Sequence, residues 1–322
     1  MSALTAPPAF AAVVAGLYET VVTPGDKPRD SAFAEAMRQV AVRVSGSREA
    51  AERIMATRPA PDPRRYVQQF SFKGDGTAQV SFDSSTFDRL LTTAGLPIWA
   101  RERPAVLVWL SIQDSAGRTG WQGATDRSPE RESIEAVAKA RGIPLVWPSL
   151  DATDLGIGTG LAGGSRSHDQ LMSSAERYRA DAVLVGTTIS GGSIRWSFAF
   201  NGEVIDLTST LEDGMHLAAD TCGKLLAVGA DVRGAVALKI SGIRDLDAYA
   251  RTLNYLEGLT LVRAVTVQQL QGDQLDLVLS VRGDASALRR TIGLSKRLTP
   301  RDAQGANPGA TTDRLHYDFQ PQ

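Results

Sequence analysis

The 322-residue sequence is poor in the side chains that most often form metal sites and activated nucleophiles. It has one cysteine and three histidines, His168, His216 and His316. One cysteine excludes an intramolecular disulfide and a zinc site built from cysteines. Three scattered histidines leave little for a histidine-based cluster. We therefore expect no catalytic residue, no metal site and no cofactor.

Charge of one sign and long apolar runs are also missing. The 35 Lys and Arg residues balance 36 Asp and Glu residues, which gives a formal net charge of -1. Such a balance provides no field that would gather nucleic acid or an anionic membrane. The longest apolar stretch, residues 4–18, is interrupted by Pro7 and Pro8 and is shorter than the roughly 20 residues that span a bilayer. We expect no nucleic-acid partner and no transmembrane segment.

The first residues resemble the end of a secretory leader. Ala9, Phe10 and Ala11 fit the small-x-small pattern of a cleavage site. The basic start and a full apolar core of a leader are absent. We interpret residues 1–12 as a signal-peptide remnant; the alternative is a frayed terminus that has no targeting role.

Hydrophobic periodicity and turn residues divide the rest of the chain into three domains. In residues 13–100 the elements follow the order β-α-β-β-α, and in residues 234–300 they follow β-α-β-β-α-β, which fits a ferredoxin-like fold. Residues 301–322 are rich in Gly, Pro and Gln and are predicted to be a disordered tail. The expected fold class is α/β and α+β.

The middle domain, residues 101–232, contains apolar runs that are typical of strands buried on both faces. These runs alternate with helical patterns, and Asn201-Gly202 indicates a hairpin. Repeated β-α-β units predict a three-layer α/β domain with a mixed sheet. The runs are residues 105–112, 143–147 and 182–186.

The first and last domains share a motif as well as an element order. Val67-Gln68-Gln69-Phe70 corresponds to Val267-Gln268-Gln269-Leu270, and each motif is followed by a Gly-Asp turn and a second strand. Either the βαββα unit is duplicated or the similarity arose by chance. Small units of this kind beside a larger domain are more often docking modules than catalysts.

The glycine stretch Gly158-Thr159-Gly160-Leu161-Ala162-Gly163 has the spacing G-x-G-x-x-G. In a dinucleotide site these glycines lie in the tight turn that leaves a strand. Here the predicted strand stops at Pro148, about ten residues earlier. We interpret the stretch as a flexible loop without a phosphate-binding role.

The candidate binding residues follow two predicted strands of the middle domain. In open α/β sheets ligands bind at the carboxyl ends of the strands, where Trp109, Trp147, Asp151 and Asp154 are expected. The two aspartates are suited either to capping the following helical turn or to binding a hard cation. All five tryptophans fall between residues 99 and 196, so they form either a large core or an aromatic groove.

Six phrases in collinear order resemble the uncharacterised bacterial family known as domain of unknown function 2066, over residues 15–230. Members typically carry a secretory leader, and the family has no established activity, so the resemblance implies export but no site. The middle domain is also similar in architecture to an α/β domain of curli-secretion and Tol periplasmic proteins. The phrases are AFAEAMRQVAVRVSG (32–46), YVQQFSF (66–72), GLPIW (95–99), RPAVLVWL (103–110), RGIPLVWPSLDATD (141–154) and RYRADAVLVG (177–186).

These observations predict a non-enzymatic, periplasmic cell-envelope protein that acts through contacts with an envelope protein or through self-association. The alternative is a domain that binds a small ligand or a divalent cation at the strand ends. A third hypothesis, a hydrolase that uses the aspartates, requires a carboxyl group whose pKa is raised in a cleft.

Overall fold

The computed structural model describes residues 12–23, 29–73, 76–113, 118–162, 167–189, 192–229, 233–295, 297–301 and 314–320. Helices and strands are mixed in several sheets, which confirms the α/β and α+β class. The chain divides into two compact units. The central unit consists of Met1–Ala15 and Arg103–Leu225, and the flanking unit consists of Gly16–Glu102 and Leu226–Gln322. The three domain boundaries expected from the sequence stay a prediction.

The central unit is built on a six-stranded mixed sheet in the order β11-β10-β9-β6-β7, with β8 also paired to β6. β6 is parallel to β8 and β9, and the other pairs are antiparallel. The apolar run predicted as a buried strand is β6, in which the first five side chains are fully buried. The strands are β6 (Val106–Gln113), β7 (Thr119–Trp121), β8 (Leu145–Val146), β9 (Ala182–Thr188), β10 (Ile194–Phe200) and β11 (Glu203–Ser209).

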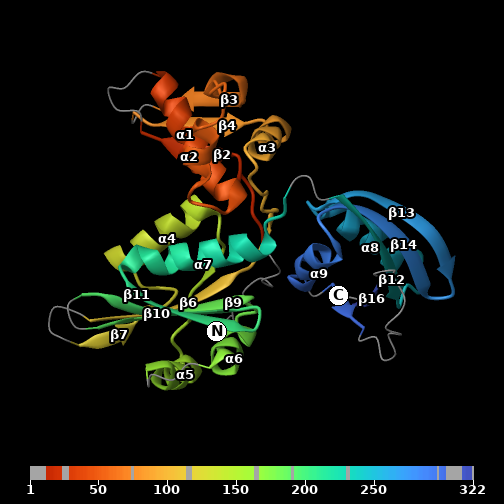
Figure 1. The fold of residues 1–322 in the computed structure, drawn as a ribbon. Coiled ribbons are helices and arrows are strands. Elements are labelled where there is room, and N and C mark those ends of the chain that lie inside the picture. The colour runs from red at the N-terminus through yellow and green to blue at the C-terminus, as the bar shows by residue number, and fades with distance from the viewer. Residues whose placement is uncertain are drawn as a thin grey trace. The chain divides into compact units, whose positions relative to one another are not determined.

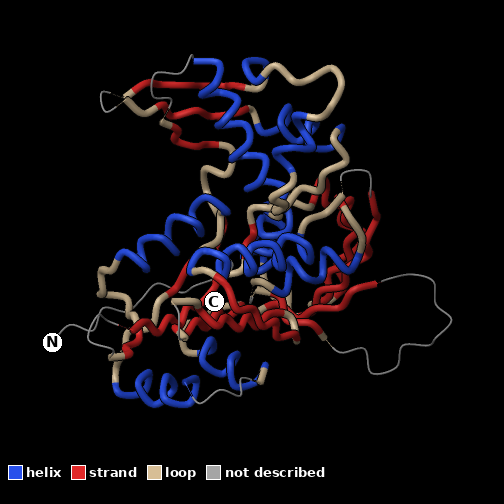
Figure 2. Tube along the Cα trace, turned by 60° about the vertical axis from the view of Figure 1, so that its left-hand side comes forward, coloured by secondary structure: helices blue, strands red, loops and turns tan. Residues whose placement is uncertain are grey.

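Helices cover both faces of this sheet, α4 and α7 on one face and α5 and α6 on the other (Figure 1, Figure 2). α4 begins where the sequence predicts, because Ser128 accepts a hydrogen bond from the Arg131 amide and Pro129 opens the first turn. It ends at Gly142, whose left-handed conformation (φ 68°) favours glycine. The three-layer prediction is confirmed. The helices are α4 (Pro129–Arg141), α5 (Ala152–Ala162), α6 (His168–Glu176) and α7 (Leu211–Leu226).

The N-terminal module of the flanking unit has a three-stranded sheet in the order β2-β4-β3. Helices α1 and α3 follow the predicted β-α-β-β-α order, and a short additional helix, α2, follows α1. The predicted signal remnant lies outside the described residues except for Ala12. The elements of this module are β2 (Glu19–Val22), α1 (Arg29–Ser45), α2 (Ala50–Met55), η1 (Pro63–Arg65), β3 (Val67–Phe72), β4 (Ala78–Phe82) and α3 (Ser84–Thr93). The short strand β1 (Ala12–Val13) belongs to the central unit, and the boundary between the units falls within β5 (Glu102–Arg103).

The C-terminal module of the flanking unit has a five-stranded sheet in the order β13-β14-β12-β16-β15. Its first five elements follow the predicted order β-α-β-β-α. The elements are β12 (Arg233–Ser241), α8 (Leu246–Gly258), β13 (Val262–Gln271), β14 (Gln274–Arg282), α9 (Ala285–Gly293), β15 (Leu298–Pro300) and β16 (Arg314–Phe319).

The prediction that residues 301–322 form a disordered tail is wrong for β16. This strand pairs in parallel with β12 and antiparallel with β15, so the predicted last strand is separated from β12 by β16. Leu315 and Tyr317 alternate along β16 and are 4% and 2% exposed. The burial of these two side chains stabilises the strand, although the average Gly- and Pro-rich composition of residues 301–322 suggests disorder.

The duplicated sequence motif has a structural counterpart. The three-strand orders β3-β4-β2 and β13-β14-β12 correspond, and both edge strands have an irregular register at the second residue of the motif, Gln68 and Gln268. A β-bulge at this position keeps the apolar residues before and after it on one face of the sheet. A shared bulge at an equivalent residue supports duplication over chance similarity.

Candidate functional site

The candidate site lies where β8 leads through Trp147 into helix α5. The carboxylate of Asp151 accepts hydrogen bonds from the backbone amides of Thr153 (3.1 Å) and Asp154 (3.0 Å). This is the geometry of a helix N-cap. Of the two roles that the sequence allowed for Asp151, helix capping is the one that these hydrogen bonds show.

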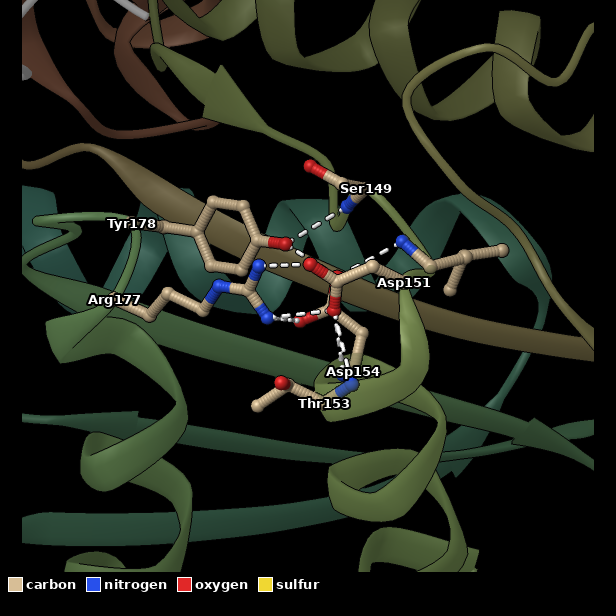
Figure 3. Close-up of polar contacts among 7 residues, drawn as sticks. Ser149, Asp151, Thr153, Asp154, Arg177 and Tyr178 are labelled. Atoms are coloured by element: carbon tan, nitrogen blue, oxygen red, sulfur yellow. Dashed lines mark hydrogen bonds and ion pairs between the residues drawn. The ribbon is translucent and has the colours of Figure 1, made fainter. Parts of the chain in front are cut away.

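Asp154 is completely buried at the start of α5. Its Oδ2 accepts hydrogen bonds from the Leu150 amide (2.8 Å) and the Tyr178 hydroxyl, and its Oδ1 accepts one from Arg177 (3.0 Å) (Figure 3). Leu150 has a positive φ of 58°, a conformation that is costly for a side chain other than glycine. The hydrogen bond to Asp154 holds the backbone in this conformation.

Arg177 follows helix α6 and binds both aspartates. Its Nη1 donates to Asp151 (2.8 Å) and Asp154 (3.0 Å), and its Nη2 donates to Asp151. The guanidinium also lies 5.6 Å from the ring centroid of Tyr178. One arginine therefore ties the end of α6 to the beginning of α5. We call Asp151, Asp154, Arg177 and Tyr178 the α5–α6 clamp.

The electrostatics of the clamp favour an ionised Asp151 carboxylate. The hydrogen bond from Arg177 holds the pKa of Asp151 well below its usual range, and the same bond raises the pKa of Arg177. Burial, together with the hydrogen bond to Asp154, raises the pKa of Tyr178. A general acid needs the opposite shift in a carboxyl group. The clamp geometry thus provides no support for the hydrolase hypothesis.

The carboxylate oxygens of the clamp bind protein groups and not a metal cation. The oxygens of Asp151 and Asp154 are engaged by one guanidinium, one phenol and backbone amides. Across the part of the chain that the structure describes, no three His, Cys, Asp or Glu side chains are grouped so that they could hold a metal ion.

The two candidate tryptophans have packing roles. Trp109 is fully buried on β6 and meets Trp121 edge-on, with 5.5 Å between ring centroids. Trp147 is 7% exposed, and the Arg131 guanidinium lies 5.0 Å from its ring centroid. The structure brings the two aspartates together, whereas Trp109 belongs to the core between the sheet and helices α5 and α6.

A hollow lies next to Arg131, at the start of α4. It has a volume of about 860 Å³ and is lined mainly by charged side chains. Arg131 is held there by the carbonyl oxygens of Gly123 (2.6 Å) and Asp126 (2.9 Å) and by Glu135 (2.8 Å). Arg131 therefore contacts both the ring of Trp147 and the hollow.

The described part of the glycine stretch is helical, so the prediction of a flexible loop is wrong. Gly158 and Gly160 lie within α5, whereas Gly163 lies outside the described residues. A Cβ at Gly158 would lie 2.6 Å from Nε1 of Trp121, so glycine allows this ring to approach the helix. Gly160 faces open space. The Asp151 cap and the apolar contacts of Ile157 and Leu161 favour the helix despite its glycines.

Gly158 and Gly160 provide a matched pair for a stability test. We expect Gly158→Ala to lower the free energy of unfolding by about 1–2 kcal/mol, because the new methyl group overlaps Trp121. Gly160→Ala should raise it by up to about 1 kcal/mol, because alanine favours the helix and meets no neighbour. Urea titrations of both variants check the prediction, and equal changes in both would contradict it.

Sequence reasoning missed Arg177 and Tyr178. They lie more than twenty residues from the aspartates, and only the packing of α5 beside α6 brings the four side chains together. One signal was available: Arg177 occupies the C-cap of a helix, where a cation is favoured by the helix dipole.

Comparison with known proteins gives one match. Residues 11–100 match a domain of unknown function (DUF8605). The match covers the N-terminal module and less than a third of the chain. It supports an uncharacterised domain in this stretch and leaves the resemblance to the 2066 family a prediction. No curated protein and no solved structure matches the chain.

The single cysteine, like Trp109, has a packing role in the core. Cys222 is fully buried on α7, and burial raises the pKa of its thiol well above the usual value. A thiol that stays protonated and inaccessible is not a nucleophile. Cys222 belongs to the core of the central unit.

Proposed function

We propose that the protein is a non-enzymatic component of the cell envelope that acts through protein contacts. The supporting observation is the pair of equivalent edge strands in the flanking unit. Phe70 and Phe72 on β3 are 47% and 42% exposed, and Val267 and Leu270 on β13 are 39% and 51% exposed.

Exposed apolar edge strands are rarely left uncovered, because their free backbone groups and side chains pair with other chains. β3 and β13 are each the last strand of their sheet. Both copies of the duplicated unit expose apolar side chains at the equivalent strand, which favours a shared binding role. The occupant is an envelope protein or a second copy of the chain.

Export to the periplasm is part of the proposal. It is supported by the small-x-small pattern at residues 9–11 and by the resemblance to the 2066 family, whose members typically carry a secretory leader. The curli-secretion and Tol resemblance of the central unit is consistent with the same compartment. None of the described helices is long and apolar enough to cross a membrane.

The role of the edge strands is tested by replacing Phe70 and Leu270 with serine. We expect this variant to lose self-association or cross-linking to an envelope partner, because each change removes an exposed apolar contact. Light scattering after size exclusion and cross-linking in periplasmic extract measure the two outcomes. Leu246→Ser is the matched control, because Leu246 is 80% exposed but lies on α8.

A plain monomer that cross-links to no protein would contradict the proposed function. Equal loss of association in the Leu246→Ser control would also contradict it, because the effect would then be a general consequence of lower surface hydrophobicity.

A second candidate function is the binding of a small ligand beside Trp147. The indole Nε1 of Trp147 is buried and has no hydrogen-bond partner in the described structure, and Arg131, which lies over its ring, also lines the hollow. Thermal stabilisation by an envelope metabolite or divalent cation that Trp147→Phe abolishes would favour this function.

A further inference from the structure

The N-terminal module contains a groove between its Pro-rich loop and helix α3. Its volume is about 990 Å³. One wall is the loop around Pro59 and Pro61. The other wall consists of Thr86, Arg89, Leu90 and Thr93, whose spacing places them on one face of α3.

Positive charge dominates this groove. Arg58, Arg65 and Arg89 line it, together with a single acidic residue, Asp62. Asp62 has a structural task, because its carboxylate accepts a hydrogen bond from the Arg64 amide (3.1 Å) and caps the short helix η1. The groove therefore has a local charge excess in a chain whose total charge is close to zero.

The three arginines are not neutralised within the described structure. Arg58 donates to the carbonyl oxygens of Ala56 (3.3 Å) and Thr57 (3.1 Å), and Arg89 donates to the Thr86 hydroxyl (3.1 Å). Arg65 makes no side-chain hydrogen bond or ion pair to a described residue. No carboxylate of the described chain pairs with any of the three guanidinium groups.

Asp83 is an acidic residue whose carboxylate interacts with the charge of Arg89. The pKa of Asp83 is lowered mainly by hydrogen bonds from Thr86, then Ser85, and least by the charge of Arg89. The carboxylate of Asp83 caps α3 by accepting from the Thr86 amide (2.8 Å). Asp83 is thus committed to the helix and leaves Arg89 available.

Other arginines of the same module have clear internal tasks. Arg38 pairs with Glu35 (3.2 Å), Arg43 donates to the carbonyl oxygen of Glu19 (2.5 Å), and Arg53 binds the carbonyl oxygens of Ala94 and Gly95 at the end of α3. The groove arginines differ from these three in making only local contacts to neutral oxygens, or none.

We infer that this groove binds an acidic peptide segment of a partner protein, an inference that rests on the proposed role in protein contacts. Carboxylates of the peptide would pair with the three guanidinium groups, which form stronger hydrogen bonds to charged than to neutral acceptors. Apolar side chains of the peptide would lie against Pro59, Pro61 and Leu90. The balanced charge of the whole chain and these apolar walls favour a peptide over nucleic acid or a lipid surface.

The experiment uses the full chain and a fluorescein-labelled peptide that alternates glutamate with leucine. The groove variant carries Arg58→Gln, Arg65→Gln and Arg89→Gln. The matched control carries Arg38→Gln, Arg251→Gln and Arg301→Gln, which removes the same charge from arginines that are 43%, 48% and 57% exposed and lie outside the groove. Equal urea midpoints of the two variants establish that both are folded.

Fluorescence anisotropy is expected to show saturable binding to the wild type and a loss of about tenfold or more in affinity for the groove variant. The control variant should bind like the wild type, and a peptide with glutamine in place of glutamate should not bind. Equal weakening in the control, or no saturable binding to the wild type, would overturn the inference. So would arginine-dependent binding of anionic lipid vesicles or single-stranded DNA without binding of the peptide.

The groove and the wider proposal can fail separately. If the groove variant cross-links to its envelope partner as well as the wild type does, the groove inference is wrong and the proposed function stands. If the wild type forms no protein contact but binds the acidic peptide at the groove, the proposed function fails by itself.

Discussion

Replacing Asp154 with alanine is expected to lower the free energy of unfolding of the central unit by about 3 kcal/mol. The change removes a fully buried carboxylate and leaves the Leu150 amide and the Tyr178 hydroxyl without their acceptor. Each buried polar group left without a partner costs about 1–3 kcal/mol. Leu150 also loses the hydrogen bond that holds its positive φ. Urea unfolding followed by tryptophan fluorescence measures the effect, because Trp109, Trp121, Trp147 and Trp196 all belong to the central unit.

Asp151→Ala is the matched control for this prediction. Asp151 is 47% exposed and caps α5, so its removal should cost clearly less than removal of the buried Asp154 carboxylate. A cost equal to that of Asp154→Ala would show that the clamp depends on the Arg177–Asp151 pair instead of on the buried carboxylate.

The clamp also predicts how stability changes with acid. The folded-state pKa of Asp151 is depressed by Arg177, so its contribution is complete above the ordinary aspartate pKa of about 3.9. The contribution is lost as the pH falls below that value toward the folded-state pKa. Between pH 7 and pH 5 the difference in stability between wild type and Asp151→Asn should stay constant, and it should shrink below about pH 4. A difference that changes near neutral pH would contradict the assignment.

The clamp shows how far the sequence could define the candidate site. Asp151 could be interpreted as a cap because a helix cap depends on residues three positions apart. Arg177 could not be assigned to the same site, because its contact with Asp151 requires the folded arrangement of α5 and α6. For Trp109, the local structure was predictable and the contacts were not. Its position in a strand was predictable, but its burial on the α5 side depends on Leu161 and Leu171 from two later helices.

The fold was predictable where one local signal dominated. The run that forms β6 begins with five consecutive apolar residues, and Ser128-Pro129 marks the start of α4 by itself. Prediction failed where the local composition favours a loop but tertiary contacts stabilise a helix or a strand. The glycines of α5 suggest a loop, but one of them provides space for Trp121. Similarly, the Gly- and Pro-rich tail conceals β16, whose stability comes from pairing with a strand more than seventy residues earlier.

We expect that replacing Tyr317 of the C-terminal strand with alanine lowers the free energy of unfolding by about 3–5 kcal/mol. Tyr317 is 2% exposed, pairs with Ile240 of β12 and Pro300 of β15, and belongs to the apolar core of the C-terminal module. Its ring therefore packs against the apolar core on one face of the sheet, where truncation to alanine would leave a cavity. Hydrogen exchange of the β12 amides and urea unfolding measure the loss.

Tyr317→Phe separates packing from hydrogen bonding at this position. The Tyr317 hydroxyl is buried without a partner in the described structure, and burial raises its pKa above the usual value. Because an unpaired buried hydroxyl is destabilising, the phenylalanine variant should be as stable as the wild type or more stable by about 1 kcal/mol. If Tyr317→Ala were as stable as Tyr317→Phe, residues 314–319 would contribute nothing to the core, and the original expectation of a disordered tail would be correct. The pair of variants thus decides whether the last strand is an integral part of the sheet.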